Sequence, residues 1–364
     1  MRRCDMASMA ACGLLAMLMA GGCATHGSSP KAIEPVSADS TQLPATQPRD
    51  LLDGGATIEG GGVTLRVNPD VGRVVFFGET GGENLLWLDG HAEVETLEHR
   101  KGRTWANWGG DKLWLAYQNM WPSLFGGGGP RWPPDAVIDG AAWTLLVDAP
   151  NAIVMESPPS PELAVVARRR FEITGEGEVL ITNTVTRREP APFPVMVWSV
   201  TQTPMPDLIL LHADADAPAA VPPVTHFGNP HPDEGWRELT DGRVRQWLPP
   251  ETQNRKVGTL GRGLVATFGD HAFFQTHPYD PLAAYPDASS VQVYRDPGRY
   301  TELELLSPQV QLRPGESLVH RVRWRLEPVA GRGPAGLAAR LRTLVAEHPG
   351  PVESDKRSRR RFAD

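Results

Sequence analysis

Short hydrophobic segments recur along the chain from Ala56 onward, and glycine, proline, asparagine and aspartate separate them. This pattern is typical of short β-strands joined by turns, and many such strands predict a sandwich or a barrel. The alternation is clearest where Val322, Trp324 and Leu326 take turns with arginines, which makes one face of a strand apolar. We expect strands at residues 63–67, 73–77, 143–147, 153–157, 165–173, 179–186, 195–201, 264–268, 291–294, 301–305 and 318–326.

Three further segments depart from the strand pattern. Leu337, Leu341 and Leu344 have helical spacing and predict a short helix over residues 336–347 that packs on the edge of the sandwich. Residues 119–134 and 213–251 are predicted to be long loops, and loops of such length in a compact domain are often functional.

The N-terminus has the features of an export signal. Two arginines precede an apolar stretch at residues 7–19 that is short for a membrane span. Small residues then lead to Cys23, and this segment resembles the lipobox of bacterial lipoproteins, although Ala20 stands where leucine is more usual. The resemblance implies that Cys23 is acylated; the alternative is an ordinary secretory peptide cleaved nearby. Ala24, in place of aspartate, favours a lipid-anchored protein at the outer membrane that faces the periplasm.

These patterns divide the chain into five expected parts. They are a signal peptide at 1–22, a flexible tether at 23–50, an antiparallel β-sandwich at 51–330, a C-terminal helix at 331–350 and a disordered basic tail at 351–364.

Composition narrows the chemistry. The formal net charge is −7 over 364 residues, a mild acidity that argues against nucleic-acid binding. All three cysteines (Cys4, Cys12 and Cys23) lie near the N-terminus, so the body of the protein contains no disulfide, thiol nucleophile or cysteine metal site. We find no P-loop, nucleophile elbow or zinc-protease motif, and His226 and His231 are interpreted as polar surface. We expect neither a metal nor a cofactor, and we expect a monomer.

One segment combines flat apolar rings with groups that bind hydroxyls. Its residues are Asn107, Trp108, Asp111, Lys112 and Trp114, continued by Gln118 and Trp121, with two glycines between Trp108 and Asp111. A concave ligand site needs that mixture of apolar walls and a few fixed polar groups. The alternative is a glycine turn between strands with tryptophans in the core. Lys112 and Arg131 are candidates to hold an acidic or phosphorylated sugar.

Several blocks, in order, resemble a known family. Glu-Asn-Leu-Leu-Trp at 83–87 is similar to the opening of galactose-mutarotase-like proteins. The 107–114 block, Asn183-Thr184, the Trp198 to Gln202 segment and Glu302-Leu-Glu304 before a Pro-Gly-Glu turn resemble the bacterial branch called domain of unknown function 4380. The resemblance covers about residues 56–328 and implies a large antiparallel β-supersandwich whose concave face binds sugars.

The family resemblance also implies aldose 1-epimerase chemistry, in which a carboxylate base and a histidine acid act on one sugar. Glu302 and Glu304 lie where the base is expected and share one face of a strand; we favour Glu304. The places of the two family histidines resemble Trp108 and the Trp198–Gln202 strand end instead, so that both histidines are missing. His277, in a His-Pro-Tyr-Asp segment, is a candidate for a displaced acid.

Three functions follow as hypotheses. The leading one is a cell-envelope lipoprotein that binds a saccharide through the 107–121 residues, Arg131, Trp198 and Gln202. The second is an active aldose 1-epimerase or sugar isomerase with Glu304 or Glu302 as base and His277 or a tyrosine as acid. The third is a structural envelope protein that binds protein partners.

Overall fold

The computed structural model describes residues 51–89, 105–125, 134–214, 224–240 and 242–347, all within the compact unit Gln47–Asp364. The expected signal peptide, Cys23, the whole tether, Arg131 and the basic tail lie outside the described residues. None of the helices in the described part is long and apolar enough to cross a membrane.

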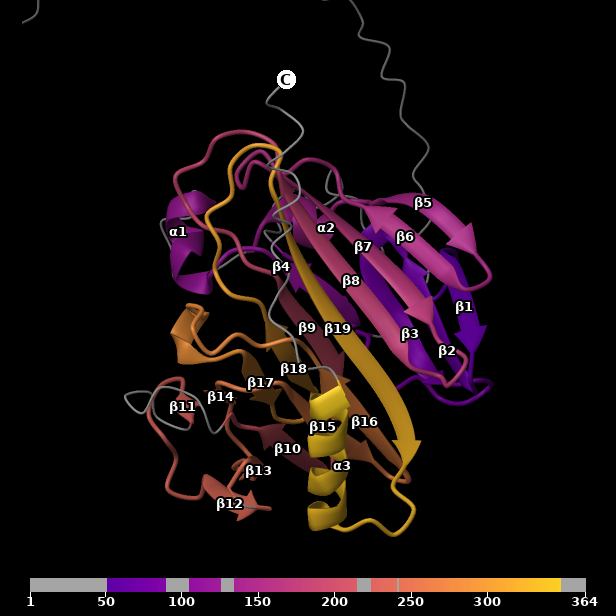
Figure 1. Ribbon diagram of the computed structural model, residues 1–364, viewed down its shortest axis with the longest axis vertical. Coiled ribbons are helices and arrows are strands. Elements are labelled where there is room, and N and C mark those ends of the chain that lie inside the picture. Colours follow the sequence, from indigo (N-terminus) through magenta and orange to yellow (C-terminus); the bar gives the residue numbers. More distant parts are fainter. Residues whose placement is uncertain (1–50, 90–104, 126–133, 215–223, 241, 348–364) are drawn as a thin grey trace, which may run out of the picture. The chain divides into compact units, whose positions relative to one another are not determined.

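Two large antiparallel sheets form the described structure (Figure 1). In spatial order, the nine-stranded sheet contains β1 (Ala56–Gly60), β2 (Val63–Asn68), β3 (Arg73–Glu79), β4 (Asp111–Trp114), β9 (Trp198–Thr203), β18 (Tyr300–Leu306), β17 (Val291–Asp296), β14 (Arg255–Thr259) and β11 (Thr225–His226). The ten-stranded sheet contains β12 (Gly235–Leu239), β13 (Val244–Leu248), β10 (Leu208–His212), β15 (Gly263–Phe268), β16 (His271–Thr276), β19 (Ser317–Pro328), β8 (Val179–Arg187), β7 (Val165–Ile173), β6 (Ala152–Glu156) and β5 (Thr144–Ala149).

Helices are short apart from one. The α-helices are α1 (Trp121–Leu124), α2 (Ala136–Gly140) and α3 (Pro334–Glu347), and 3-10 turns cover Pro69–Val71, Gln118–Met120 and Pro286–Ala288. Helix α3 confirms the predicted C-terminal helix and buries Leu337, Leu341 and Leu344. It contacts β10, β15 and β16, so it covers part of the ten-stranded sheet (Figure 1).

The core lies between the sheets, and strand alternation creates it. Along β8 and most of β19, buried and half-buried residues alternate, so that Val322 and Trp324 point inward while the arginines between them point outward, as the sequence predicts. Phe77 of β3, Phe273 of β16 and Trp324 of β19 pack with ring centroids 5.1–5.3 Å apart and thereby join the two sheets. The predicted all-β, antiparallel fold is confirmed.

One predicted loop is wrong. Residues 213–251 contain strands β11, β12 and β13, in addition to residues 215–223 and 241, which are not described. The hairpin of β12 and β13 places Trp236 opposite Trp247, and the two indoles stack with centroids 6.4 Å apart. Because these strands are short and lie among proline and charged residues, they show no clear alternation of apolar and polar positions in the sequence. The cross-strand pair of tryptophans identifies them only in the structure.

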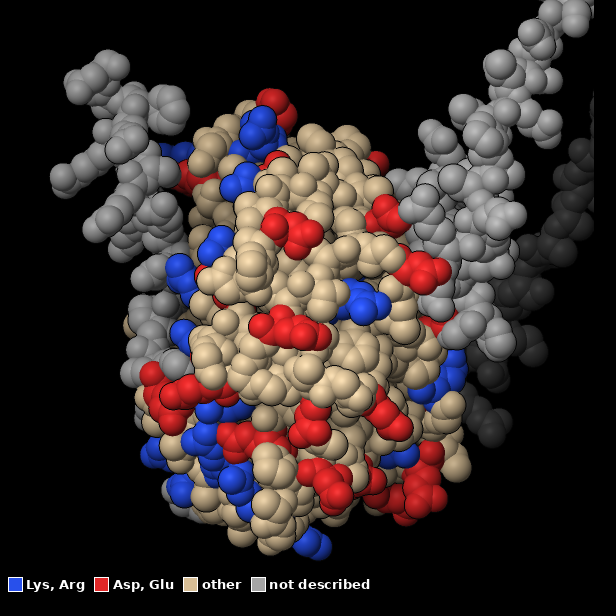
Figure 2. Space-filling model, turned by 90° about the vertical axis from the view of Figure 1, so that its right-hand side faces the viewer, with Lys and Arg blue, Asp and Glu red and all other residues tan. Residues whose placement is uncertain are grey.

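Charged groups of both signs are interspersed over the face of the molecule in Figure 2, with acidic groups gathered toward its lower half. Since the whole chain carries a net charge of −7, this distribution is the one expected of a mildly acidic surface.

Candidate functional site

A glycine turn places the side chains of β4 on two different faces. Gly109 and Gly110 have φ of +83° and +70°, which L side chains rarely adopt, and they lead directly into Asp111. Alternation then sends Asp111 toward the ten-stranded sheet, where Arg169 of β7 binds it, while Lys112 and Trp114 lie on the opposite face. The predicted binding segment therefore divides between the core and the outer face of the nine-stranded sheet.

Gly110→Ala is expected to destabilise the protein by roughly 1–3 kcal/mol, because an alanine there must keep a positive φ. An added Cβ would also lie 2.2 Å from the carbonyl oxygen of Val74. Urea unfolding measures the effect. Gly269→Ala is the matched control, with φ of +56° and nothing within 4 Å of the added Cβ. Equal losses in both variants would show that the close approach to Val74 has no effect.

The outer face holds a pocket of about 430 Å³. Side chains from β4, β9, β14, β17 and β18 and from the segments that connect strands line it, and five of them are aromatic. The lining residues are Trp105, Trp114, Gln118, Trp198, Lys256, Tyr294, Asp296, Arg299, Tyr300 and Glu302. Of the predicted binding residues, Trp114, Gln118 and Trp198 line this pocket, together with Glu302 from the predicted catalytic pair.

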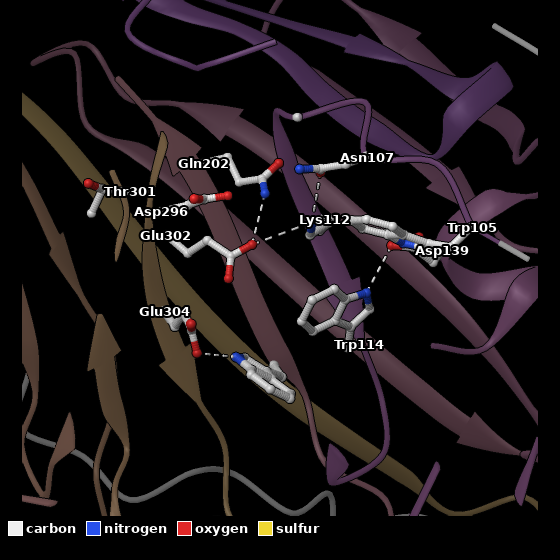
Figure 3. A network of polar contacts seen from close by, with 12 residues as sticks. Trp105, Asn107, Lys112, Trp114, Asp139, Gln202, Asp296, Thr301, Glu302 and Glu304 are labelled. Atoms are coloured by element: carbon white, nitrogen blue, oxygen red, sulfur yellow. Dashed lines mark hydrogen bonds and ion pairs between the residues drawn. The ribbon is translucent and has the colours of Figure 1, made fainter. Parts of the chain in front are cut away.

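Glu302 lies at the centre of the polar contacts around the pocket (Figure 3). Its Oε1 accepts a hydrogen bond of 2.8 Å from Gln202 Nε2 and lies 3.7 Å from Lys112 Nζ. Among the described residues, no hydrogen bond reaches its second oxygen, Oε2. Tyr294 lies directly opposite on β17, and burial raises the pKa of its phenol to about 12, so this hydroxyl keeps its proton at neutral pH. The pocket wall thus offers an available acceptor beside a phenol that retains its proton.

Glu304 lies on the same strand face, behind the pocket wall. Its side chain is fully buried, and its Oε2 accepts hydrogen bonds of 2.8 Å from Trp198 Nε1 and from Lys256 Nζ. Burial raises the pKa of Glu304 to about 7, and the neighbouring Glu302 adds to the rise while Lys256 opposes it. The preferred base of the sequence analysis therefore does not line the pocket, whereas Glu302 does.

Lys112 is a buried ammonium between the pocket and the glycine turn. Its Nζ lies 3.4 Å from Asn107 Oδ1, and 4.7 Å and 5.4 Å from the ring centroids of Trp114 and Trp105. Burial lowers the pKa of Lys112 to about 8, although Glu302 partly opposes the shift. Ring faces and a carboxylate thus stabilise the cation in place of water.

Asp139 of α2 orients the two indoles beside Lys112. Its carboxylate accepts hydrogen bonds from Trp105 Nε1 at 2.8 Å and Trp114 Nε1 at 2.9 Å, and Arg73 binds it at 3.0 Å. Asp139 and Arg73 were not predicted from the sequence, because nothing in the local pattern shows that α2 lies beside β4. Trp114 also packs on Trp121 and Trp198, with centroids 5.1 Å and 5.0 Å away, and we call these three residues the indole cluster.

Six lining residues were not predicted from the sequence: Trp105, Lys256, Tyr294, Asp296, Arg299 and Tyr300. For Tyr300 a signal was present, because it shares the strand face of Glu302. The sequence does not pair Lys256 of β14 with Glu304 of β18, because the two residues lie 48 positions apart.

Other candidate residues lie away from the pocket. Trp108 packs in a small apolar cluster with Leu51, Val71 and Val75, and Trp121 is buried within the indole cluster. Two tryptophans of the segment therefore follow the alternative interpretation, in which they belong to the core.

His277 is fully buried beside the ten-stranded sheet and is absent from the pocket lining. Its Nε2 lies 3.2 Å from the Gly261 carbonyl, which can only accept, so Nε2 carries the proton. Its Nδ1 therefore accepts from His320 Nε2 at 3.0 Å. Burial and the neighbouring His320 hold the pKa of His277 well below its usual value.

A second and larger pocket, of about 630 Å³, lies between β3 and the β15–β16 hairpin. Four of its lining residues are acidic: Glu79, Glu83, Asp207 and Asp270. It has no tryptophan or tyrosine in its lining and only one phenylalanine, Phe268. Within the described residues, no group of three or more histidine, cysteine or acidic side chains is placed to hold a metal ion. The smaller pocket, which combines five aromatic rings with charged and amide groups, is therefore the better candidate for a ligand site.

Residues 56–327 match the family described as Domain of unknown function (DUF4380). No curated protein matches the chain. Among solved structures, an aldose epimerase homologue from C. elegans is 11% identical with a TM-score of 0.43, covering 76% of this chain and 99% of that one. A Klebsiella pneumoniae protein provisionally named an aldose 1-epimerase is 12% identical with a TM-score of 0.49, covering 80% and 83%. The Slr1438 protein from Synechocystis is 11% identical with a TM-score of 0.47, covering 78% and 98%. The likeness concerns the fold alone.

Proposed function

We propose that this chain, which belongs to the family described as Domain of unknown function (DUF4380), binds a carbohydrate on the outer face of the nine-stranded sheet. The family description names no ligand, so the proposal rests on the chemistry of the pocket. The observation that carries the proposal is the arrangement of five aromatic rings around the Glu302 carboxylate. Sugars present apolar ring faces and polar edges, and a wall of this kind meets both.

The size and charge of the pocket narrow the ligand class. Its volume of about 430 Å³ falls within the range of ordinary small-molecule sites. Two cations, Lys256 and Arg299, line it with two carboxylates, Asp296 and Glu302. Arg299 bonds Asp296 at 3.0 Å, and Lys256 bonds the buried Glu304 at 2.8 Å, so neither cation is left without a carboxylate. We therefore propose a neutral saccharide rather than an acidic or phosphorylated one.

Trp105→Ala is expected to weaken saccharide binding about tenfold, or roughly 1.4 kcal/mol, because it removes one ring from the wall. A panel of neutral sugars and glycans, followed by calorimetry on those that bind, measures the loss. Trp236→Ala is the matched control, a tryptophan of similar half-burial outside the pocket. Absence of binding across the panel, or equal losses in the two variants, would contradict the proposed site.

An aldose 1-epimerase or sugar isomerase is the second candidate, and one observation favours it. Glu302 lines the pocket and keeps Oε2 without a hydrogen bond from the described residues, as a general base requires. We propose that, if sugar interconversion occurs, Glu302 takes the hydroxyl proton and a tyrosine of the wall, Tyr294 or Tyr300, acts as the acid. Mutarotation measured by polarimetry tests this, since Glu302→Gln should abolish a rate that survives in Tyr285→Phe, which lies outside the pocket.

We further propose that Cys23 carries a lipid that holds the protein at the outer membrane, facing the periplasm. The proposal rests on the arrangement of arginines, apolar residues and small residues before Cys23. Mass spectrometry of the mature N-terminus and membrane fractionation test it. An unmodified N-terminus other than Cys23 would contradict lipidation.

A further inference from the structure

Two buried amides next to the pocket each keep one end without a hydrogen bond. Asn107 Nδ2 and Gln202 Oε1 are both buried and have no partner, although the opposite end of each amide is bound. Buried polar atoms without partners are rare in proteins, and each one calls for an explanation. In Figure 3 the side-chain ends of Asn107 and Gln202 face one another, and both belong to the contacts around Lys112 and Glu302.

Charge fixes which end of each amide is free. Gln202 must present its Nε2 to the Glu302 carboxylate, because an amide oxygen there would face another acceptor. Asn107 must present its Oδ1 to the Lys112 ammonium for the converse reason. The free ends are therefore one acceptor, Gln202 Oε1, and one donor, Asn107 Nδ2.

We propose that Asn107 and Gln202 together bind one hydroxyl group of the saccharide, and that this contact selects its position on the sugar ring. A hydroxyl can donate to Gln202 Oε1 while it accepts from Asn107 Nδ2. A carboxylate offers no donor and an ammonium no acceptor, so each would satisfy only one of the two atoms. The inference rests on the proposed saccharide function and adds a recognition rule to it.

The surrounding contacts make the pair rigid and bring it close to the pocket. Gln202 is held by Glu302, which lines the pocket, and Asn107 follows two residues after Trp105, which also lines it. Lys112 lies between them, 3.4 Å from Asn107 and 3.7 Å from Glu302. The two amides thus lie directly behind residues that line the pocket, and the proposal places one hydroxyl of a sugar stacked on the aromatic wall at their free ends.

The test is calorimetry on the full-length chain in detergent with D-galactose and D-glucose, followed by the 2-, 3-, 4- and 6-deoxy derivatives of the sugar that binds. One deoxy derivative is expected to bind about 10- to 100-fold more weakly than its parent, because both amide ends then lose their partner. The other three derivatives should lose far less. This comparison uses the unmodified protein and does not depend on how any variant folds.

Asn107→Asp then assigns the effect, since it replaces the donor Nδ2 with an oxygen and keeps an acceptor for Lys112. It should bind the parent sugar more weakly and distinguish it less from the critical deoxy derivative, because the hydroxyl loses the donor Nδ2 and keeps only an acceptor. Asn68→Asp, at another buried asparagine outside the pocket, should keep the distinction. If no sugar of the neutral panel binds, the proposed function fails and this inference with it. If all derivatives bind like the parent, or Asn107→Asp keeps the full distinction, only the inference fails.

Discussion

Asp111→Ala is expected to lower the free energy of unfolding by about 3–5 kcal/mol, because it leaves the buried guanidinium of Arg169 without its carboxylate. Both side chains are fully buried, and Thr201 Oγ1 also donates to Asp111 Oδ2 at 2.9 Å. The pair joins β4 of one sheet to β7 of the other through the core. Urea or thermal unfolding at pH 7 measures the loss.

Two further sets of variants distinguish the effect of this buried ion pair on stability from that of a surface ion pair. Arg168, the neighbour of Arg169, pairs with Glu156 on the surface at 2.6 Å, and Arg168→Met should change stability by less than about 1 kcal/mol. The double variant Asp111→Leu with Arg169→Met should recover much of the stability lost by Asp111→Ala, since no buried charge remains without a partner. If Asp111→Ala costs no more than Arg168→Met, the core ion pair has no stabilising role.

Glu304→Gln is expected to gain stability relative to the natural protein as the pH rises above 7, because it removes the cost of ionising a buried carboxyl, and its amide oxygen can still accept from Lys256. Glu304 lies directly opposite Gln292, and each residue has a buried Oε1 without a hydrogen-bond partner. A proton on Glu304 would provide the donor that these two acceptors lack. A glutamine provides an N–H at the same place at every pH.

The pH dependence follows from the direction of the pKa shift. The pKa of Glu304 is raised from 4.5 to about 7, so between these values the folded protein holds a proton that the unfolded chain releases. Stability therefore falls as the pH rises through this window, and the penalty is complete above it. Thermal unfolding from pH 5 to pH 8 should show this fall in the natural protein and a flatter profile in Glu304→Gln. Gln292→Leu, which removes the facing acceptor and keeps Glu304 ionisable, should retain the fall; identical profiles in all three proteins would contradict the argument.

The fold was largely predictable because its strands carry their own pattern. Strand β7 begins and ends where its alternation predicts, at Val165 and Ile173, and β19 matches within two residues. Strand β4 was not predicted, because its four residues follow two glycines and its polar members face opposite sides. The strands within 213–251 were missed because they are short and are stabilised by pairing with distant segments rather than by a local pattern.

The site was only partly predictable. Alternation placed Glu302 and Glu304 on one face, as the structure shows, but it does not decide which of them reaches the pocket. That difference arises from Trp198 and Lys256, which cover Glu304 from β9 and β14. In the same way, the order of residues shows that tryptophans are near the glycine turn. Tertiary packing decides that Trp114 lines the pocket while Trp108 lies in a small apolar cluster.

The indole cluster gives the pocket an optical signal of its own. Trp114 lies edge-on to both Trp121 and Trp198, at centroid distances of 5.1 Å and 5.0 Å, and two of the three rings line the pocket. Transition dipoles so close together and inclined to one another couple, and coupled indoles produce a paired positive and negative band in circular dichroism. The intensity of that band depends on the angles between the rings. A ligand that changes these angles would therefore change the ellipticity of the protein itself, without a label.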